Sequence, residues 1–187
     1  MKRLFLFILF LMSISQAFAD CGNDTIKRTV GEEVAQPTNT VSKAIHQWLQ
    51  QHQCKVGFEV DNGCIVGFEY QDNLYLVGAD DANDFFVLSK ILYLENEVYS
   101  FLNQKGYLQQ YLESANRSFG IKADVNEVKG SDQYQISLQC EMFTFGHAIE
   151  PYMERALRLV NHWRKEIYPY YNIYLETKNA EAKEKQE

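Results

Sequence analysis

Four cysteines are the side chains of this sequence with the widest range of chemistry: Cys21, Cys54, Cys64 and Cys140. Their spacings do not match the paired ligands of a zinc site, so no metal is predicted on them. An even number of cysteines instead indicates disulfides in a protein that reaches an oxidising compartment, and four cysteines allow three pairings.

The sequence contains no pattern typical of a catalytic centre. It has no nucleophile elbow and no glycine-rich phosphate loop. The acidic segment 80–84 lacks the glycine and the final carboxylate of a calcium loop, because Phe86 and Leu92 stand at those positions. The histidines do not form a clear metal pair: His46, His52, His147 and His162. We therefore predict a non-enzymatic protein without a cofactor. The alternative is an enzyme or small-ligand binder with a site assembled from scattered residues such as Glu141 and His147.

The N-terminus has the features of a signal peptide over residues 1–19. Two basic residues precede an apolar run over 4–12, and an A-x-A motif ends at Ala19. Cleavage is expected between Ala19 and Asp20, which predicts a periplasmic or secreted protein. The alternatives are a membrane anchor, for which the run is too short, and lipidation of Cys21, which Asp20 disfavours. No later segment is apolar for long enough to predict a stable membrane span.

Length and charge limit the class of protein. Removal of 19 residues leaves 168 of the 187, enough for one domain with a sizeable core. The mature chain carries 16 basic and 25 acidic residues, a net charge of −9. Such a balance argues against nucleic acid and anionic membranes as partners.

Composition divides the mature chain into three parts. Residues 20–38 are polar with few apolar positions and predict a flexible N-terminal arm. Residues 39–176 contain the periodic segments and predict a single α+β domain. Residues 177–187 are highly charged and predict a disordered tail.

The first half of the domain is predicted to be a helix followed by strands. Apolar residues recur at helical spacing over 41–49, with Thr40 as N-cap. Period-two alternation over 54–70, around a three-residue turn at 61–63, predicts a hairpin with one apolar face. In this hairpin Val60 faces Cys64, Phe58 faces Val66, Val56 faces Phe68 and Cys54 faces Tyr70.

The second half of the domain again contains both strand-like alternation and helical spacing of apolar residues. Segment 74–77 predicts a third strand, and 85–94 fits a buried strand or the front of a helix, of which its aromatic and β-branched content favours the strand. Segment 98–115 has helical spacing with a weak point at Gly106. An alternating hairpin then spans 121–142, with Gln135, Ser137, Gln139 and Glu141 on a solvent-facing side, and a long helix spans 151–167.

These strands limit the disulfide pairings. Cys54 and Cys64 share a face of the hairpin but lie too far apart along it to be bonded. Cys64 and Cys140 both point toward the predicted core. We predict that they pair if their strands are neighbours, which leaves Cys21 to reach Cys54.

The predicted order α-β-β-β-(β)-α-β-β-α, with an antiparallel sheet, resembles the type III secretion chaperone-like fold, which includes YbjN-type domains. The similarity is most specific from Asn116 to Ile167: Asn116-Arg117-Ser118, the two strands that follow, Glu141 and Phe143, and the final helix with Arg155, Leu157 and Leu159. The resemblance implies a non-enzymatic domain that binds protein segments and often forms a homodimer. Chaperones of this fold work in the cytoplasm, whereas this chain has the features of an exported protein.

A tyrosine-rich segment follows Pro169 and has two interpretations. Its aromatic side chains either fold back to close the core or form a partner contact: Tyr170, Tyr171 and Tyr174. Taken together, the sequence predicts an exported, chaperone-like module of the cell envelope that binds a protein or peptide. A structural component of the envelope is a third hypothesis.

Overall fold

The computed structural model describes residues 40–60, 64–144 and 148–184. The predictions for the signal peptide with its Ala19–Asp20 cleavage site, the arm at 20–38, Cys21, the turn at 61–63 and His147 fall outside the described residues. Within these ranges the helices and strands follow one another in the order α2 (Val41–Gln51), β1 (Lys55–Val60), β2 (Ile65–Tyr70), β3 (Asn73–Asp80), β4 (Phe85–Glu95), α3 (Asn96–Gln104), α4 (Tyr107–Arg117), β5 (Lys122–Glu127), β6 (Gln133–Phe143), α5 (Ile149–Glu166) and α6 (Tyr168–Glu184).

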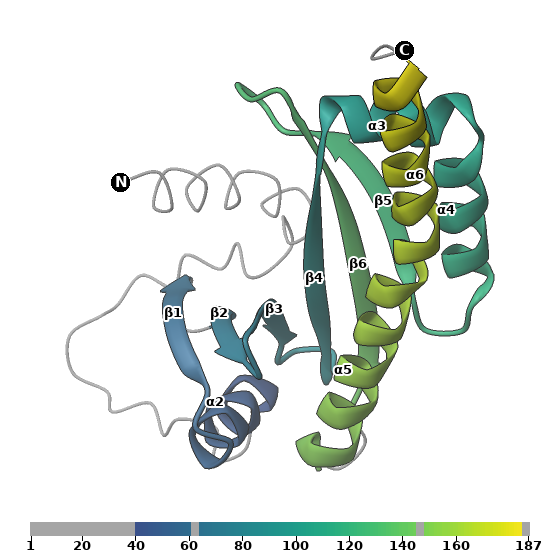
Figure 1. The fold of residues 1–187 in the computed structure, drawn as a ribbon. Helices are drawn as coiled ribbons and strands as arrows, with labels where there is room; N and C mark the ends of the chain where they lie inside the picture. Colours follow the sequence, from purple (N-terminus) through teal and green to yellow (C-terminus); the bar gives the residue numbers. More distant parts are fainter. Residues whose placement is uncertain (1–39, 61–63, 145–147, 185–187) are drawn as a thin grey trace, which may run out of the picture.

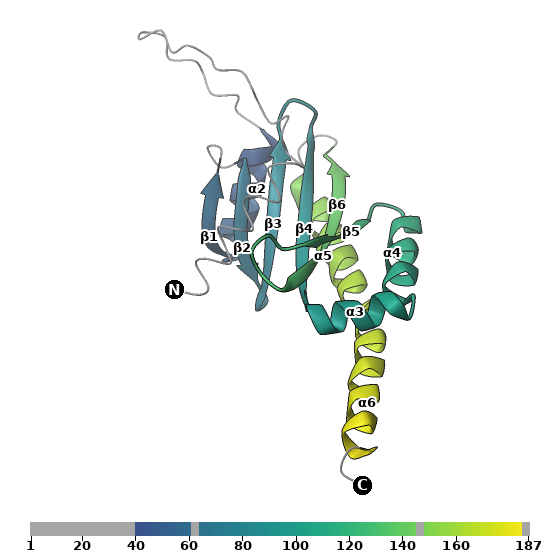
Figure 2. The same ribbon diagram turned by 90° about the horizontal axis from the view of Figure 1, so that it is seen from above.

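The strands form one antiparallel six-stranded sheet in the order β1-β2-β3-β4-β6-β5. Helices α2 and α5 lie on the same face of this sheet, while α3, α4 and α6 gather at one end (Figures 1 and 2). The predicted α+β class and element order are confirmed, including the choice of a strand for residues 85–94. No helix in the described part of the chain is both long and apolar enough to cross a bilayer.

Strand β4 pairs with β6 along its whole length. The two strands pair from Phe85↔Phe143 to Glu95↔Gln133, and β3 pairs with the first part of β4, from Phe85 to Ser89, so this first part is interior to the sheet. Its side chains Phe86 and Leu88 on one face are fully buried, and Val87 on the other face is 7% exposed, which explains why the segment lacks the polar alternation of a half-exposed strand.

The predicted register of the first hairpin is right at one end only. Val56 pairs with Phe68 as predicted, but a β-bulge follows, and Phe58 then pairs with Gly67 instead of Val66. The extra residue moves every later side chain of β1 to the opposite face of the sheet. Val60 accordingly pairs with Ile65 and not with Cys64.

Two further sequence predictions need correction. The single helix expected over 98–115 is two helices, because Gly106 adopts a left-handed backbone with φ of 72° that ends α3 and starts α4.

The polar side of the second hairpin is only partly in water. Gln135 and Ser137 are buried because β6 lies between β4 and β5, whereas Glu141 near its end is exposed.

The predicted Cys64–Cys140 disulfide required neighbouring strands, and the strands that hold the two cysteines are not neighbours. Cys64 immediately precedes β2 and Cys140 lies on β6, and strands β3 and β4 stand between them. Three inter-strand steps separate the two strands by about 14 Å, well beyond the Cα distance that a disulfide spans. Cys140 is instead a buried thiol whose pKa burial raises to about 12.

The C-terminal segment is a helix. Residues 177–184, expected from composition to begin a disordered tail, form the last turns of α6. Tyr174 of this helix is buried, and its ring lies 5.4 Å from that of Phe101 on α3. Helix α6 therefore packs on the end of the domain through a few aromatic side chains.

The turn between β2 and β3 generates the first stability prediction. Tyr70 pairs with Asn73 across a two-residue loop in which Gln71 and Asp72 have φ of 49° and 59°. Two left-handed residues define a turn that prefers glycine at its second position. Replacing Asp72→Gly should therefore raise the free energy of unfolding by about 0.5 to 1 kcal/mol, measured by urea denaturation.

A matched control lies in the loop between β5 and β6. Asp132 is not among the described residues with positive φ, so Asp132→Gly should only add unfolded-state entropy and lower the stability. Equal effects of the two substitutions would show that strain in the β2–β3 turn does not limit stability.

Candidate functional site

A groove of about 710 Å³ lies along strands β1 to β4, and a smaller, more polar hollow of about 550 Å³ lies between α4 and β5. Sixteen residues line the groove, and most of them come from the end of the sheet nearest the β2–β3 turn: Lys55, Val56, Gly57, Phe58, Gly67, Phe68, Glu69, Asp72, Asn73, Leu74, Tyr75, Leu76, Ser89, Lys90, Ile91 and Tyr93.

Strand register assigns the middle of the groove to the sheet face that α2 and α5 do not cover. Val66 and Phe68 point toward α2, where the Phe68 ring lies 6.4 Å from the ring of Trp48. Their neighbour Gly67 is therefore on the other face, together with its partner Leu76. Ser89, which pairs with Leu76, continues this row onto β4.

The groove has a closed base and an open apolar rim. Leu76 and Ser89 at the base are 4% and 6% exposed. Leu74 and Tyr93 at the rim are 62% and 41% exposed, which is unusual for large apolar side chains within strands. A charged pair closes one side, where Lys55 Nζ lies 3.3 Å from Glu69 Oε1.

Gly67 makes room for one wall of the groove. A Cβ atom at this position would lie 2.0 Å from the ring of Phe58, so the aromatic ring rests directly on the glycine backbone. The β-bulge next to Gly57 is what turns Phe58 to this face. The bulge and the glycine together shape the β1 side of the groove.

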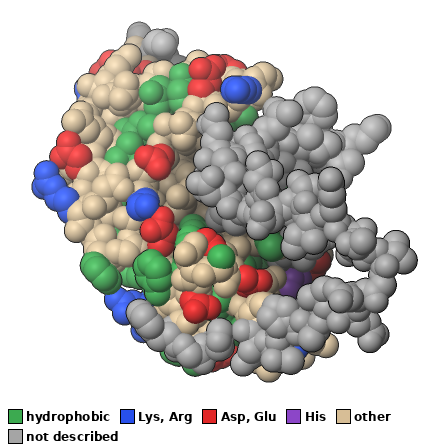
Figure 3. Space-filling view, turned by 180° about the vertical axis from the view of Figure 1, so that it is seen from behind, with side chains coloured by type: hydrophobic (Ala, Val, Ile, Leu, Met, Phe, Trp, Pro, Cys, Tyr) green, Lys and Arg blue, Asp and Glu red, His purple; other side chains and the backbone are tan. Residues whose placement is uncertain are grey.

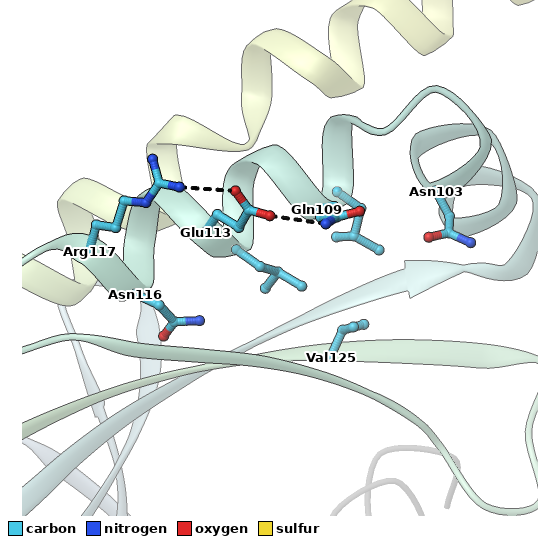
Figure 4. A pocket seen from close by; sticks show the side chains of 8 residues that line it. Asn103, Gln109, Glu113, Asn116, Arg117 and Val125 are labelled. Atoms are coloured by element: carbon cyan, nitrogen blue, oxygen red, sulfur yellow. Dashed lines mark hydrogen bonds and ion pairs between the residues drawn. The ribbon is translucent and has the colours of Figure 1, made fainter.

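The hollow between α4 and β5 is already internally paired (Figure 4). Glu113 accepts hydrogen bonds from both Gln109 and Arg117. Asn116 uses its amide to donate to the carbonyl of Ala123 and to accept from its N–H, at 2.8 and 2.7 Å. The Glu113 contacts stay within α4, and Asn116 fastens α4 to β5, so this hollow is a packing feature.

The residues weighed as catalytic or metal ligands do not converge in the described structure. The acidic loop is engaged locally: Asp80 accepts from the N–H groups of Ala82 and Asn83, and Asp81 accepts from Ser42 at the start of α2. Glu141 pairs with Lys122. Within the described ranges, no three His, Cys, Asp or Glu side chains are grouped so as to hold a metal ion.

The remaining histidines lie apart from the groove and beside carboxylates. His52 stacks on Trp48 with ring centroids 4.2 Å apart, and its Nε2 is 3.2 Å from Glu150. His162 lies 3.7 Å from Glu166 on the same helix. They belong to the helical surface and contribute nothing to the groove.

The three tyrosines proposed as a contact site divide between the two interpretations. Tyr174 is buried, and Tyr170 stacks on Tyr107 with ring centroids 5.3 Å apart. Tyr171 stays 38% exposed, beside exposed Ile173 on the same helix. The segment therefore closes the core with one side and presents apolar side chains with the other.

Charged side chains on the face seen from behind are scattered. Lys and Arg side chains alternate with Asp and Glu side chains there and do not gather into a basic stripe in the part of the chain described (Figure 3). Apolar side chains lie among them. Such a surface lacks the electrostatic footprint with which proteins hold a phosphate backbone.

Sequence reasoning missed the groove. The predicted register placed Phe58 on the core face, and the bulge that moves it was not anticipated. A usable signal was present at Leu74 and Tyr93, which are large apolar residues on strand positions that face away from the helices.

Comparison with known proteins supports the fold only. The chain is similar to the crystal structure of an uncharacterised protein from Methanothermobacter thermautotrophicus, with a TM-score of 0.54, 11% identity and coverage of 71% of this chain and 97% of that one. It is also similar to YbjN from E. coli, with a TM-score of 0.48, 11% identity and coverage of 68% and 90%. No protein-family model and no curated protein matches the chain.

The packing of Phe58 on Gly67 is testable by a double-mutant cycle. Gly67→Ala should lower the free energy of unfolding by about 1 to 3 kcal/mol, because the new Cβ overlaps the Phe58 ring. In a Phe58→Ala background the same change should cost much less, since the clashing ring is gone. Urea denaturation of the four proteins measures both, and equal costs in the two backgrounds would disprove the contact.

Proposed function

We propose that this protein is an exported, non-enzymatic binding module that holds the apolar face of an amphipathic helix from a partner protein in the β1–β4 groove. The observation that carries the proposal is the exposed apolar rim of Leu74 and Tyr93 above a closed base of Leu76 and Ser89. An apolar patch bounded by charged groups is typical of a protein-interaction surface.

The dimensions of the groove favour a helix as occupant. Four adjacent strands span about 14 Å between the first and the last, and a helix with its side chains is about 10 to 12 Å across. The opposite face of the same sheet is already covered by helices α2 and α5 (Figure 2). A partner helix would complete a three-layer arrangement in which each face of the sheet packs on helices.

Strand addition at the sheet edge is a weaker alternative. Strand β1 is an edge of the sheet, but a bulge interrupts it between Val56 and Phe58, and the charged Lys55 stands at its start. Bulges and lysines are features that discourage edge pairing. We therefore place the partner on the face of the sheet.

The lining residues also support a binding role. The described groove contains no histidine or cysteine. Of its two carboxylates, Glu69 is paired with Lys55 at the rim, and Asp72 lies in the exposed β2–β3 turn. A nucleophile with an adjacent base, which a hydrolytic centre needs, is not assembled there.

A peptide-binding experiment tests the occupant. The probe is a fluorescent, net-neutral amphipathic helix of leucine, lysine and glutamate, and fluorescence anisotropy measures its binding to the mature chain. Leu74→Asp should weaken saturable binding about tenfold or more. Because Leu74 is 62% exposed, its substitution should change the stability by only about 0.5 kcal/mol.

The controls separate the groove from general hydrophobic adhesion. Leu175→Asp on α6, which removes a side chain that is 41% exposed, should leave binding unchanged. A scrambled peptide of equal composition should not bind. Equal loss in both variants would overturn the proposal, and so would a homodimer in analytical ultracentrifugation that Leu74→Asp dissociates, since the groove would then hold a second copy.

Export is part of the proposal and rests on the N-terminal sequence. The charged start, the apolar run and the Ala19 motif support processing by a signal peptidase. N-terminal sequencing of protein recovered from an envelope fraction should begin at Asp20. A chain that keeps Met1 and stays in the cytoplasmic fraction would contradict export and leave the groove prediction standing.

A further inference from the structure

Two cationic side chains share one neutral oxygen atom at the end of the sheet near the β2–β3 turn. Lys90 Nζ donates to Asn73 Oδ1 and to the carbonyl of Leu74, each at 3.1 Å. Arg164 of α5 donates through Nη1 to the same Asn73 Oδ1 at 3.0 Å. The ring of Tyr75 lies 4.6 Å from Lys90 Nζ and forms one side of the site.

The burial of this pair is costly. Lys90 is only 7% exposed, although lysine is seldom buried without an acidic partner. In the described part of the chain neither Lys90 nor Arg164 forms an ion pair with a carboxylate. The Nε atom of Arg164 is also buried without a hydrogen-bond partner. Two positive charges are thus solvated by amide oxygens and a ring, and they repel each other.

We infer that Lys90 and Arg164 form a binding site for an oxyanion, a carboxylate or a phosphate, whose oxygen takes over the hydrogen bonds that the two side chains give to Asn73 Oδ1. An oxyanion would supply the negative charge that the two cations lack, and a guanidinium and an ammonium donate to its oxygens in charge-assisted hydrogen bonds. The inference is independent of what the groove binds.

Neighbouring groups fit this assignment. The titratable groups beside Lys90 are Arg164 on α5 and Tyr75 on β3, and the Tyr75 hydroxyl donates to Asn161 Oδ1 at 2.9 Å. Asn73 donates through Nδ2 to the carbonyl of Gln71 at 2.7 Å, which fixes its oxygen toward the cations. Arg164 is only partly buried and offers the route from solvent. Lys90 and Asn73 also border the groove.

Titration of Lys90 provides an independent readout. Burial first, and the charge of Arg164 second, lower the pKa of Lys90 to about 8. An anion bound between the two cations stabilises the charged amine and raises its pKa again. Without an anion, the unfolded chain holds this proton to a higher pH than the folded one, so stability rises from about pH 8 toward 10.5 relative to Lys90→Met.

The experiment titrates the mature chain with acetate and with inorganic phosphate at constant ionic strength. Isothermal titration calorimetry should show saturable binding of at least one probe, and the stronger probe distinguishes a carboxylate from a phosphate ligand. Lys90→Met and Arg164→Gln should each weaken it about tenfold or more. Lys122→Gln, which removes an exposed lysine paired with Glu141, is the control and should bind normally.

Asn73→Asp keeps the test informative if Lys90→Met fails to fold. The aspartate would place a carboxylate between the two cations and should abolish binding of the added anion, while NMR of labelled lysine should show a raised pKa for Lys90. Absence of saturable binding of both probes to the wild-type chain would overturn the inference. Unchanged binding by folded Asn73→Asp and Arg164→Gln would overturn it equally.

Discussion

The pairing of β4 with β6 is the interaction on which the rest of the architecture depends. It runs over eleven residue pairs and joins the β1–β4 meander to the β5–β6 hairpin. Helices α3 and α4 lie between these strands in the sequence, so they must cross from the end of β4 to the start of β5. The break at Gly106 allows this crossing, because one straight helix would carry the chain away from the sheet. The non-local pairing therefore dictates where α3 and α4 end.

The same sheet supports two different surfaces. One face packs on α2 and α5 through Trp48, Phe68 and the other core side chains. On the opposite face, the bulge in β1 turns Phe58 onto Gly67, and the ring forms the β1 wall of the groove. A regular register would have kept Phe58 in the core. The β1 wall of the groove is thus a consequence of one extra residue in β1, and its shape depends on the absence of a side chain at Gly67.

Local patterns predicted the elements well and their relations less well. The apolar stripe of α2, the alternation in β6 and the aromatic content of β4 each encode burial on a known period, so the fold class follows from them. The β1 register does not, because a bulge leaves the composition of a strand unchanged. The pairing of Cys64 with Cys140 depended on strand order, which is decided by contacts between distant segments. The groove was missed because the sequence did not predict the bulge that sets the β1 register.

Strand β4 also explains why a lysine is buried at all. Alternation places Phe86, Leu88 and Lys90 on the helix-covered face, and the pairing with β6 holds that register along the full strand. Lys90 cannot turn outward without shifting β4 by one residue and exposing Phe86 and Leu88. The β2–β3 turn brings Asn73 to its amine, and α5 brings Arg164 beside it. A methionine at position 90 would fill the same space without a charge to solvate, so packing alone does not require a cation there. The convergence of three elements on two positive charges and one neutral oxygen is better explained by an anion than by the core.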